Sequence, residues 1–530
     1  MDRTGEDKRL RIVCVVATVL FLIYAGLLAT RSVRGLTSAA EVRNSWPLLC
    51  DKPVGEDGYY MLTVAENLAT THHLAYNGDL PATGIQPLAT FVYAAIAVVV
   101  NAFGGDRWTL VRAVIAFGAL LCVLFAWRLA CFARSFAPES HRSLVFTLAY
   151  FLVLFDFSVF RTFIFGLETG VYLCCLAVCI ALWRRIVSST APRWRDIVLL
   201  GIAAGFAGLA RIDFGLIFAL LLLYLLARRR AAVAQVAVCG ALALAIVSPW
   251  FLFVHRVTGG WMPTSGSAES SFGWHGAIRF DPWARALLAH IVPWSYAGSS
   301  NGFTLMLGLT GLLLIVFLAL RANDLRAALL APAMRDTFLP WAAAIFLLTL
   351  VYSGFFLSTF FYVRYFSPLL LVSIPLLALL LAKQSLPQRL PQLFLAALVV
   401  LFSLLDFYSL HNGRTGNPHY TAAAYVHETF PEVHVGAFQS GVIGYFNPNV
   451  ENLDGKLNAG ALRAARTHTL GQFIDKEGIN VLIDWPSYFD QQLTPEYLAA
   501  EWQPCAKAPP NPQDICYIRR SFLLAHSEFR

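Results

Sequence analysis

The feature that most constrains this chain is a succession of apolar segments, many of them long enough to cross a membrane as a helix. Hydrophobic residues make up 58% of the 530 residues and charged residues only 14%, whereas soluble proteins carry about 25% charged residues. So few charges cannot cover several water-soluble cores. The pattern therefore predicts an α-helical polytopic membrane protein with about 11–13 spans. The apolar segments are 12–29, 87–103, 109–132, 143–160, 170–183, 197–209, 214–227, 231–249, 303–320, 338–357, 365–382 and 392–409.

Basic residues gather in the short connections between these segments. Lys and Arg are enriched in cytoplasmic connections, so this pattern predicts a cytoplasmic N-terminus and a transmembrane domain at 1–410. It places a first outer loop at 31–86 and a second at 250–302. It also accounts for the net charge of +8 without nucleic acid as a partner. The basic residues are Arg3, Lys8, Arg9, Arg11, Arg134, Arg142, Arg184, Arg185, Arg193, Arg195, Arg228, Arg229, Arg230, Arg321, Arg326, Arg335, Lys383 and Arg389.

The number of crossings between the first outer loop and Arg134 conflicts with this orientation. Two full spans in 87–132 would leave Arg134 on the outer side with the loop. Either one segment there is re-entrant, or 143–167 contains two short helices. A second irregularity lies in 197–227, which is short for two spans at about 20 residues each. Its break at Arg211-Ile212-Asp213 predicts two short helices that meet at a polar point.

The character of the chain changes after about residue 410, where Gly, Asn, Pro and charged residues become frequent. Strand-like runs at Val433–Phe438 and Val481–Trp485 alternate with a helix-like piece at Leu457–Thr467. The pattern predicts a small extracytoplasmic α/β domain at 411–530. Cys505 and Cys516 bracket a short Pro-rich loop, which favours a disulfide in an oxidising compartment.

The first outer loop holds two adjacent acids, Glu56 and Asp57, directly before a predicted helix with Tyr60 on its apolar stripe. One interpretation is favourable acidic charge at a helix N-terminus. The other is a functional carboxylate, because partial desolvation against the membrane raises carboxylate basicity. Such a group suits deprotonation of a hydroxyl nucleophile.

Four further ionisable residues interrupt the outer ends of the spans, namely Glu168, Arg211, Asp213 and Arg364. Ionisable groups at membrane depth are costly and are usually paired or functional. One alternative is that the acids pair with the arginines to assemble helices. The other is that the arginines bind a phosphate through their fork geometry.

The second outer loop is rich in aromatic and histidine residues, among them Trp261, Trp274 and His275. An aromatic belt at the membrane interface explains this composition as well as a platform for sugar rings does. Pairing of Glu168 or Asp57 with a histidine could form a zinc site, but the spacing does not establish one. A divalent metal ion therefore stays open as a cofactor.

These residues together resemble the GT-C glycosyltransferases, over most of 50–370. The loop strings Glu56-Asp57-Gly-Tyr-Tyr, Ala65-Glu-Asn-Leu-Ala, Tyr76-Asn-Gly, Pro81-Ala-Thr-Gly and Gln86-Pro-Leu carry the resemblance. The later strings Gly166-Leu-Glu-Thr, Leu209-Ala-Arg-Ile-Asp213, Pro263-Thr-Ser265 and Arg364-Tyr-Phe-Ser-Pro368 follow in the family's order, and the tail resembles it through Val435-Gly-Ala-Phe-Gln-Ser-Gly and Asn452-Leu-Asp-Gly455. Bacterial arabinofuranosyltransferase-like proteins are nearest in pattern, and aminoarabinose transferases and protein O-mannosyltransferases are more distant.

The resemblance implies a multi-pass protein of the bacterial cytoplasmic (inner) membrane that transfers a hexosyl or pentosyl group, with inversion, from a polyprenyl-phosphate-sugar donor. The acceptor would be a cell-envelope glycan, lipid or protein at the outer face. It further implies Asp57 as the general base. Glu56 is expected beside it in the catalytic site, where it replaces an Asp often found next to that base.

The resemblance also implies the other contacts. Arg211 and Arg364 would bind the donor phosphate, and Glu168, Asp213 and Tyr60 would hold the arginines or the sugar. Trp261, Trp274 and His275 are expected to stack on the sugar or acceptor.

Two other functions compete with this reading. A transporter or lipid flippase for an envelope precursor predicts polar residues through the membrane midplane and repeats with interrupted helices. The sequence has neither feature clearly. An assembly scaffold that presents 411–530 would leave the acids of the first loop unexplained.

Overall fold

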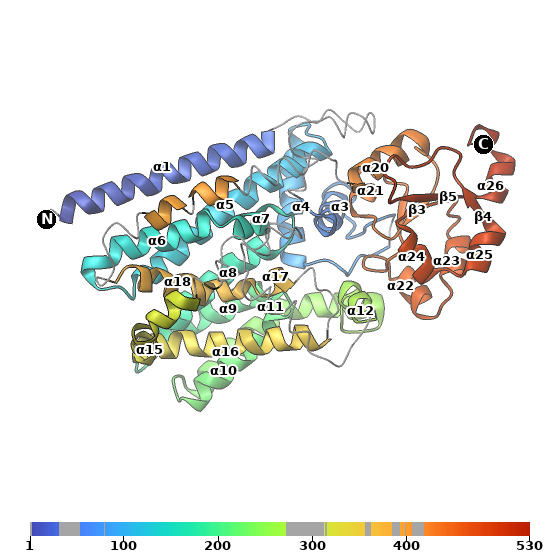
Figure 1. Cartoon of the computed structure of the whole chain (residues 1–530). Helices are drawn as coiled ribbons and strands as arrows, with labels where there is room; N and C mark the ends of the chain where they lie inside the picture. The colour runs from blue at the N-terminus through green and yellow to red at the C-terminus, as the bar shows by residue number, and fades with distance from the viewer. Residues whose placement is uncertain are drawn as a thin grey trace.

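The computed structural model describes residues 3–30, 54–78, 80–271, 312, 315–355, 362–383, 393–397, 399–404 and 418–529. It consists of a bundle of apolar helices with a smaller α/β unit at one end (Figure 1). The helices of the bundle and its loops are α1 (Arg3–Thr30), α3 (Glu56–Thr71), α4 (Pro87–Ala102), α5 (Arg107–Arg134), α6 (Arg142–Leu154), α7 (Phe157–Ile164), α8 (Thr169–Val187), α9 (Trp194–Ala210), α10 (Phe214–Ala227), α11 (Val233–Thr258), α12 (Thr264–Ser271), α15 (Ala322–Leu330), α16 (Pro332–Phe355), α17 (Tyr362–Tyr365) and α18 (Leu370–Leu381).

Five helices in the described part of the chain are long and apolar enough to cross a membrane: α1, α5, α8, α11 and α16. Shorter apolar helices accompany them at Pro87–Ala102, Phe214–Ala227, Ser367–Leu381 and Leu393–Leu404. The prediction of an α-helical polytopic membrane protein is therefore confirmed. Most of the expected span at 303–320 lies outside the described residues.

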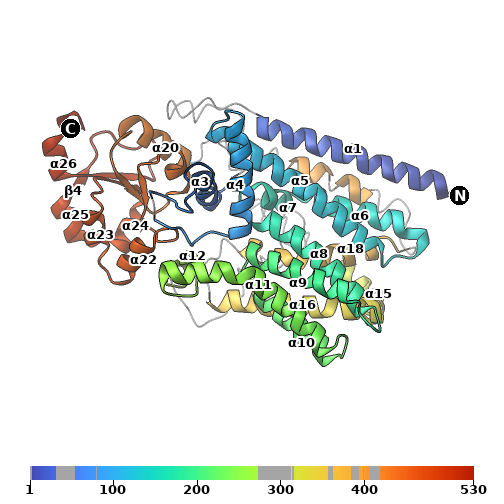
Figure 2. The ribbon, with the colours of Figure 1, turned by 180° about the vertical axis from the view of Figure 1, so that it is seen from behind.

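Helices α3 and α4 lie across the end of the bundle, whereas α1, α5 and α8 run along it (Figures 1 and 2). The segment 87–103 is thus a helix, but it runs crosswise rather than along the spans. The expected segment 143–160 divides into α6 and α7, which follow one another in the same direction. With α4 crosswise, α5 alone returns the chain to Arg134, and the conflict over crossings disappears.

The connections α5–α6, α10–α11 and α15–α16 lie at the same end of the bundle as the N-terminus (Figure 1). The α/β unit lies at the opposite end. Helices α9 and α10 meet at residues 211–213, as the sequence predicts. Helix α11 extends to Thr258 with Pro249 inside it, so the second loop begins later than residue 250. Interior Pro is tolerated in membrane helices because neighbouring groups satisfy the freed backbone.

The C-terminal unit, residues 418–529, is built on a mixed five-stranded sheet in the order β2-β1-β3-β5-β4. Strand β1 pairs in parallel with β2 and β3, and β5 pairs antiparallel with β3 and β4. The strands are β1 (Val435–Ala437), β2 (Val450–Asn452), β3 (Val481–Asp484), β4 (Trp502–Pro504) and β5 (Ile515–Arg519). The helices are α20 (Pro418–Thr429), α21 (Gly441–Phe446), α22 (Ala459–Arg466), α23 (Leu470–Lys476), α24 (Pro486–Gln492), α25 (Pro495–Glu501) and α26 (Arg520–Ala525).

Alternate residues of β3 face opposite sides of this sheet, as strand geometry requires. Val481 and Ile483 belong to the large apolar core that continues into the helical bundle. Leu482 faces a smaller core on the other side. Cys505 and Cys516 form a disulfide with a Cα–Cα distance of 5.5 Å, which links β5 to the end of β4.

Candidate active site

The start of α3 packs tightly against the loop that precedes Glu168. Gly55 donates its N–H to the carbonyl of Phe165 at 3.0 Å, and a Cβ at Gly58 would lie 2.5 Å from that same carbonyl oxygen. The glycines on either side of the two acids therefore allow a close approach that larger residues would prevent. This contact brings Asp57 to the part of the chain that carries Glu168.

Arg211 lies between two carboxylates at the junction of α9 and α10. Its Nη1 donates to Glu168 Oε1 at 2.6 Å, and its Nη2 donates to Asp213 Oδ2 at 2.6 Å. Nη2 also donates to the hydroxyl of Tyr352 at 3.1 Å. Arg211 is 4% exposed. These contacts favour the interpretation in which the acids and Arg211 hold helices together.

Arg364 approaches the same place from α17. Its guanidinium carbon lies 5.1 Å from the centre of the Tyr365 ring, and that ring stacks on Tyr352 at 4.2 Å. Arg211 lies 4.8 Å from the centre of the same ring. The two arginines therefore share one aromatic neighbour, although they come from segments far apart in the sequence.

A cavity of about 390 Å³ collects the predicted residues at this end of the bundle. Asp57, Tyr60, Glu168, Arg211, Asp213 and Arg364 all line it, with Lys456 and residues of the second outer loop. Sequence reasoning missed Lys456. Its wall also includes apolar side chains such as Met61, Leu216, Leu348 and Val351. A cavity of mixed character, with acids and arginines at one place, can bind a ligand that carries both an anionic group and hydroxyls.

Asp57 lies 3.5 Å from Lys456, measured from Oδ1 to Nζ. Burial alone would raise the pKa of Asp57, but the positive charges of Lys456 and Arg364 outweigh it and lower the pKa below its usual value. Asp57 is therefore ionised at neutral pH.

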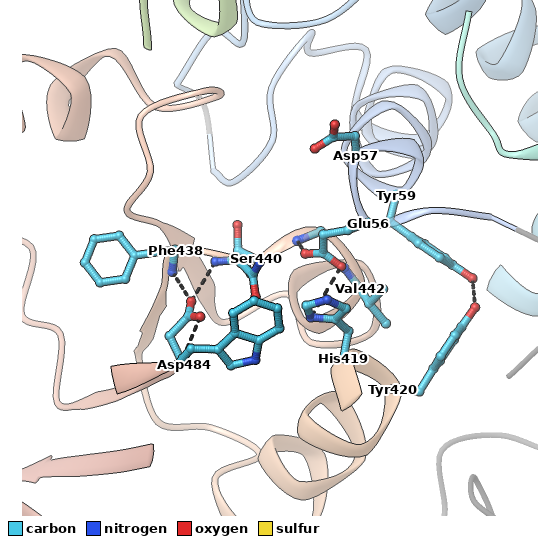
Figure 3. A network of polar contacts seen from close by, with 12 residues as sticks. Glu56, Asp57, Tyr59, His419, Tyr420, Phe438, Ser440, Val442 and Asp484 are labelled. Carbon is cyan, nitrogen blue, oxygen red and sulfur yellow. Dashed lines mark hydrogen bonds and ion pairs between the residues drawn. The ribbon is translucent and has the colours of Figure 1, made fainter. Parts of the chain in front are cut away.

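Glu56, expected in the catalytic site, is not among the residues that line the cavity. Its side chain points toward the C-terminal unit and away from that of Asp57 (Figure 3). Its carboxylate accepts the backbone N–H groups of Gly441 and Val442 at the start of α21. Nδ1 of His419 lies 4.0 Å from Oε2. Burial raises the pKa of Glu56 to about 8, although the two N–H groups oppose that shift. The two acids of the loop therefore face different surroundings.

Tyr60 also contacts the C-terminal unit, at a loop that Asp484 holds in place. The Tyr60 hydroxyl donates to the carbonyl of Phe438 and to Asp454 Oδ2, at 3.2 Å each. Asp484 accepts the backbone N–H groups of Phe438, Gln439 and Trp485 at 2.7–2.8 Å. Burial raises the pKa of Asp484 to about 7. Tyr60 thus lines the cavity and also ties α3 to β1.

The aromatic residues of the second loop are only partly described. Trp261 is 58% exposed and stacks on His255 at 4.3 Å, while its neighbours Met262 and Pro263 line the cavity. Trp274 and His275 lie outside the described residues. Among the described residues, no three His, Cys, Asp or Glu side chains are grouped to hold a metal ion.

The comparisons with known proteins identify the fold. No family model and no curated protein sequence matches the chain. Two solved structures of ArnT from Cupriavidus metallidurans match with a TM-score of 0.56. One is bound to undecaprenyl phosphate, at 14% identity over 96% of this chain and 97% of that one. The other is in the apo state, at 13% identity over 98% of each. An Archaeoglobus fulgidus oligosaccharyltransferase in the apo form matches at 14% identity over 95% of this chain and 74% of that one, with a TM-score of 0.48.

The similarity to ArnT extends over nearly the whole length of both chains. The protein therefore has the same fold as ArnT, the GT-C fold.

Proposed function

We propose that this protein is a membrane glycosyltransferase that takes a sugar from a polyprenyl-phosphate donor and transfers it, with inversion, to a hydroxyl acceptor. The observation that carries the proposal is the single cavity lined by Asp57, Glu168, Arg211, Asp213 and Arg364. The GT-C fold supports the same class. The related ArnT structure is bound to undecaprenyl phosphate, which makes a polyprenyl phosphate the first donor carrier to test.

Asp57 is the general base of the proposed reaction. It takes the proton of the acceptor hydroxyl while the acceptor oxygen forms a bond to the anomeric carbon of the sugar. The bond between that carbon and the phosphate oxygen breaks, and polyprenyl phosphate leaves with the electron pair. Attack from the face opposite the phosphate inverts the anomeric centre. Its charged neighbours keep Asp57 ionised, which is the form that can accept this proton.

We assign Arg364, which lines the cavity, to the donor phosphate. Arg211 already donates to two carboxylates and a hydroxyl, so a phosphate would have to replace buried ion pairs. We assign Glu168, Arg211 and Asp213 to a rigid wall that positions Arg364 and the sugar. The apolar part of the cavity suits the start of the prenyl chain.

The cavity belongs on the outer side of the cytoplasmic membrane in this proposal. The N-terminus and the basic connections lie at the opposite end of the bundle (Figure 1), as expected if that end is cytoplasmic. The C-terminal unit is then an extracytoplasmic domain, and its Cys505–Cys516 disulfide suits an oxidising compartment. The acceptor is a glycan, lipid or protein of the cell envelope.

The test is to incubate purified protein with a panel of polyprenyl-phosphate hexoses and pentoses and with candidate acceptors, and to search for glycosylated product by mass spectrometry. A covalent product and released polyprenyl phosphate are expected. Movement of an intact lipid-linked sugar across proteoliposomes without any covalent product would instead favour the transporter alternative.

A further inference from the structure

The C-terminal unit contributes one side chain to the cavity, and that side chain touches the candidate base. Lys456 lies in the loop between β2 and α22, and it lines the cavity with Asp57. Its Nζ is 3.5 Å from Asp57 Oδ1 and 3.9 Å from Asp454 Oδ2. The Lys456 side chain is 21% exposed. This lysine therefore joins the last part of the chain to the first outer loop at the proposed reaction centre.

The backbone at Lys456 is held by both outer loops of the bundle. The hydroxyl of Thr264 donates to the Lys456 carbonyl oxygen at 2.6 Å. A Cβ built at Gly84 would lie 1.7 Å from that same oxygen, so the first loop also passes directly against it. The Lys456 N–H donates to Asp454 Oδ1 at 2.8 Å. These contacts fix the direction in which the lysine side chain leaves the backbone.

Several charged groups face Asp57 from the elements packed around it. Lys456 from the C-terminal loop, Arg364 from α17 and His419 from α20 favour its ionised form. Glu56 precedes Asp57 on α3, and the negative charge of Asp57 helps to raise the pKa of Glu56. Asp454 lies near the same Lys456 ammonium as Asp57 does. Lys456 forms an ion pair with Asp57, with Nζ 3.5 Å from Oδ1.

We propose that Lys456 moves from Asp57 to the donor phosphate when the donor binds, and that this exchange activates Asp57. This inference rests on the proposed function. A phosphodiester oxygen competes with the Asp57 carboxylate for the Lys456 ammonium, and charge-assisted hydrogen bonds to phosphate are strong. The phosphate then lies between Lys456 and Arg364, which approach the cavity from different elements.

The exchange changes what Asp57 can do. A carboxylate paired with an ammonium is a weak base, because the positive charge favours its ionised form. Once the phosphate shares that ammonium, Asp57 loses part of its counter-charge and becomes a stronger base for the acceptor hydroxyl. Lys456 is thus a positioning residue that couples donor binding to base strength. The C-terminal unit is required for the reaction itself and not only for folding.

Binding of undecaprenyl phosphate to the full-length protein in detergent tests this inference. Lys456→Met should weaken binding ~10-fold or more, because one charge-assisted hydrogen bond is lost. Lys456→Arg should restore most of the affinity, since it keeps the positive charge. The matched control is Lys476→Met, which removes a lysine with an 80% exposed side chain from the same unit and should leave binding unchanged.

A second measurement needs no substitution. Limited acetylation of the wild-type protein, read by mass spectrometry, should show Lys456 protected by undecaprenyl phosphate while Lys476 reacts equally with and without it. If Lys456→Met binds undecaprenyl phosphate as tightly as the wild type, or Lys456 is not protected, the inference is overturned. Wild-type transfer activity combined with either result would leave the proposed function standing. Wild-type protein that neither binds the lipid nor transfers a sugar would overturn both.

Discussion

The guanidinium of Arg211 lies against the carboxylate of Glu168, with Nη1 2.6 Å from Oε1 and both side chains almost fully buried. Arg211 comes from the junction of α9 and α10, and Glu168 immediately precedes α8. The ion pair thus fixes the junction of one helix pair against the start of a third helix. Together with Asp213 it makes one wall of the cavity.

Arg211→Met should destabilise the protein by about 3–5 kcal/mol, because it leaves buried carboxylates without a counter-charge. The double variant Arg211→Met/Glu168→Gln should recover part of that loss. Thermal unfolding in detergent measures both. Glu139→Gln is the control, since its ion pair with Arg142 is exposed at the surface and is worth about 0–1 kcal/mol. Equal stability of Arg211→Met and wild type would show that the pair does not hold the helices.

Gly84→Ala should displace the loop that carries Lys456. The added Cβ would lie 1.7 Å from the Lys456 carbonyl oxygen, and such overpacking typically costs about 1–3 kcal/mol. We expect weaker binding of polyprenyl phosphate together with a lower unfolding temperature. Gly26→Ala in α1 is the matched control, because a Cβ there meets nothing within 4 Å. Unchanged lipid binding by Gly84→Ala would mean that this contact does not position Lys456.

The contact between α3 and the C-terminal unit should weaken as pH rises. Burial raises the pKa of Glu56 from its usual value of about 4.3 to about 8. Between those values the folded chain holds a proton that the unfolded chain has lost, so the unfolding free energy falls as pH increases through this window. Burial also raises the pKa of Asp484, to about 7, so the titration of Asp484 likewise lowers the unfolding free energy as pH rises.

Glu56→Gln should flatten this dependence, because the amide does not titrate. Urea unfolding of the wild type and Glu56→Gln at pH 5, 6, 7 and 8 measures it. Parallel pH profiles for the two proteins would refute the assignment of the effect to Glu56.

The disulfide should stabilise the outer edge of the sheet without affecting the reaction. Cys505 and Cys516 are 11 residues apart, and closing a loop of this size contributes roughly 2–3 kcal/mol. Replacing both by Ser should lower the unfolding temperature of the C-terminal unit and leave polyprenyl-phosphate binding intact, because β4 and β5 lie away from β1 and β2 in the sheet order. Loss of lipid binding at a temperature where the variant stays folded would contradict this view.

Much of the fold could be predicted from the sequence because apolar length and charge scarcity determine which segments are helices. The break at 211–213 and the strands near 435 and 481 were also predictable, because the local composition changes at these places. The direction of α4 could not be predicted. Hydropathy shows that a helix is apolar but not whether it lies along or across its neighbours.

The site was predictable in part. The cavity-lining acids and arginines are recognisable because ionisable residues are rare in this chain. The separation of Glu56 from Asp57 could have been found, since successive residues on a helix point about 100° apart. The place of Lys456 in the cavity could not be predicted, because it depends on how the C-terminal loop packs on Gly84 and Thr264. No local pattern distinguishes it from a surface lysine.

The most direct test compares sugar transfer by Asp57→Asn and Glu56→Gln, two isosteric replacements of neighbouring acids that face different sides of α3. Removal of a general base should slow transfer ~10²–10⁴-fold, so Asp57→Asn should be nearly inactive with unchanged folding and abundance. Glu56→Gln should keep most of the activity, because its carboxylate contacts α21 and not the cavity. Full transfer by Asp57→Asn, measured by mass spectrometry of the glycosylated acceptor, would contradict the account.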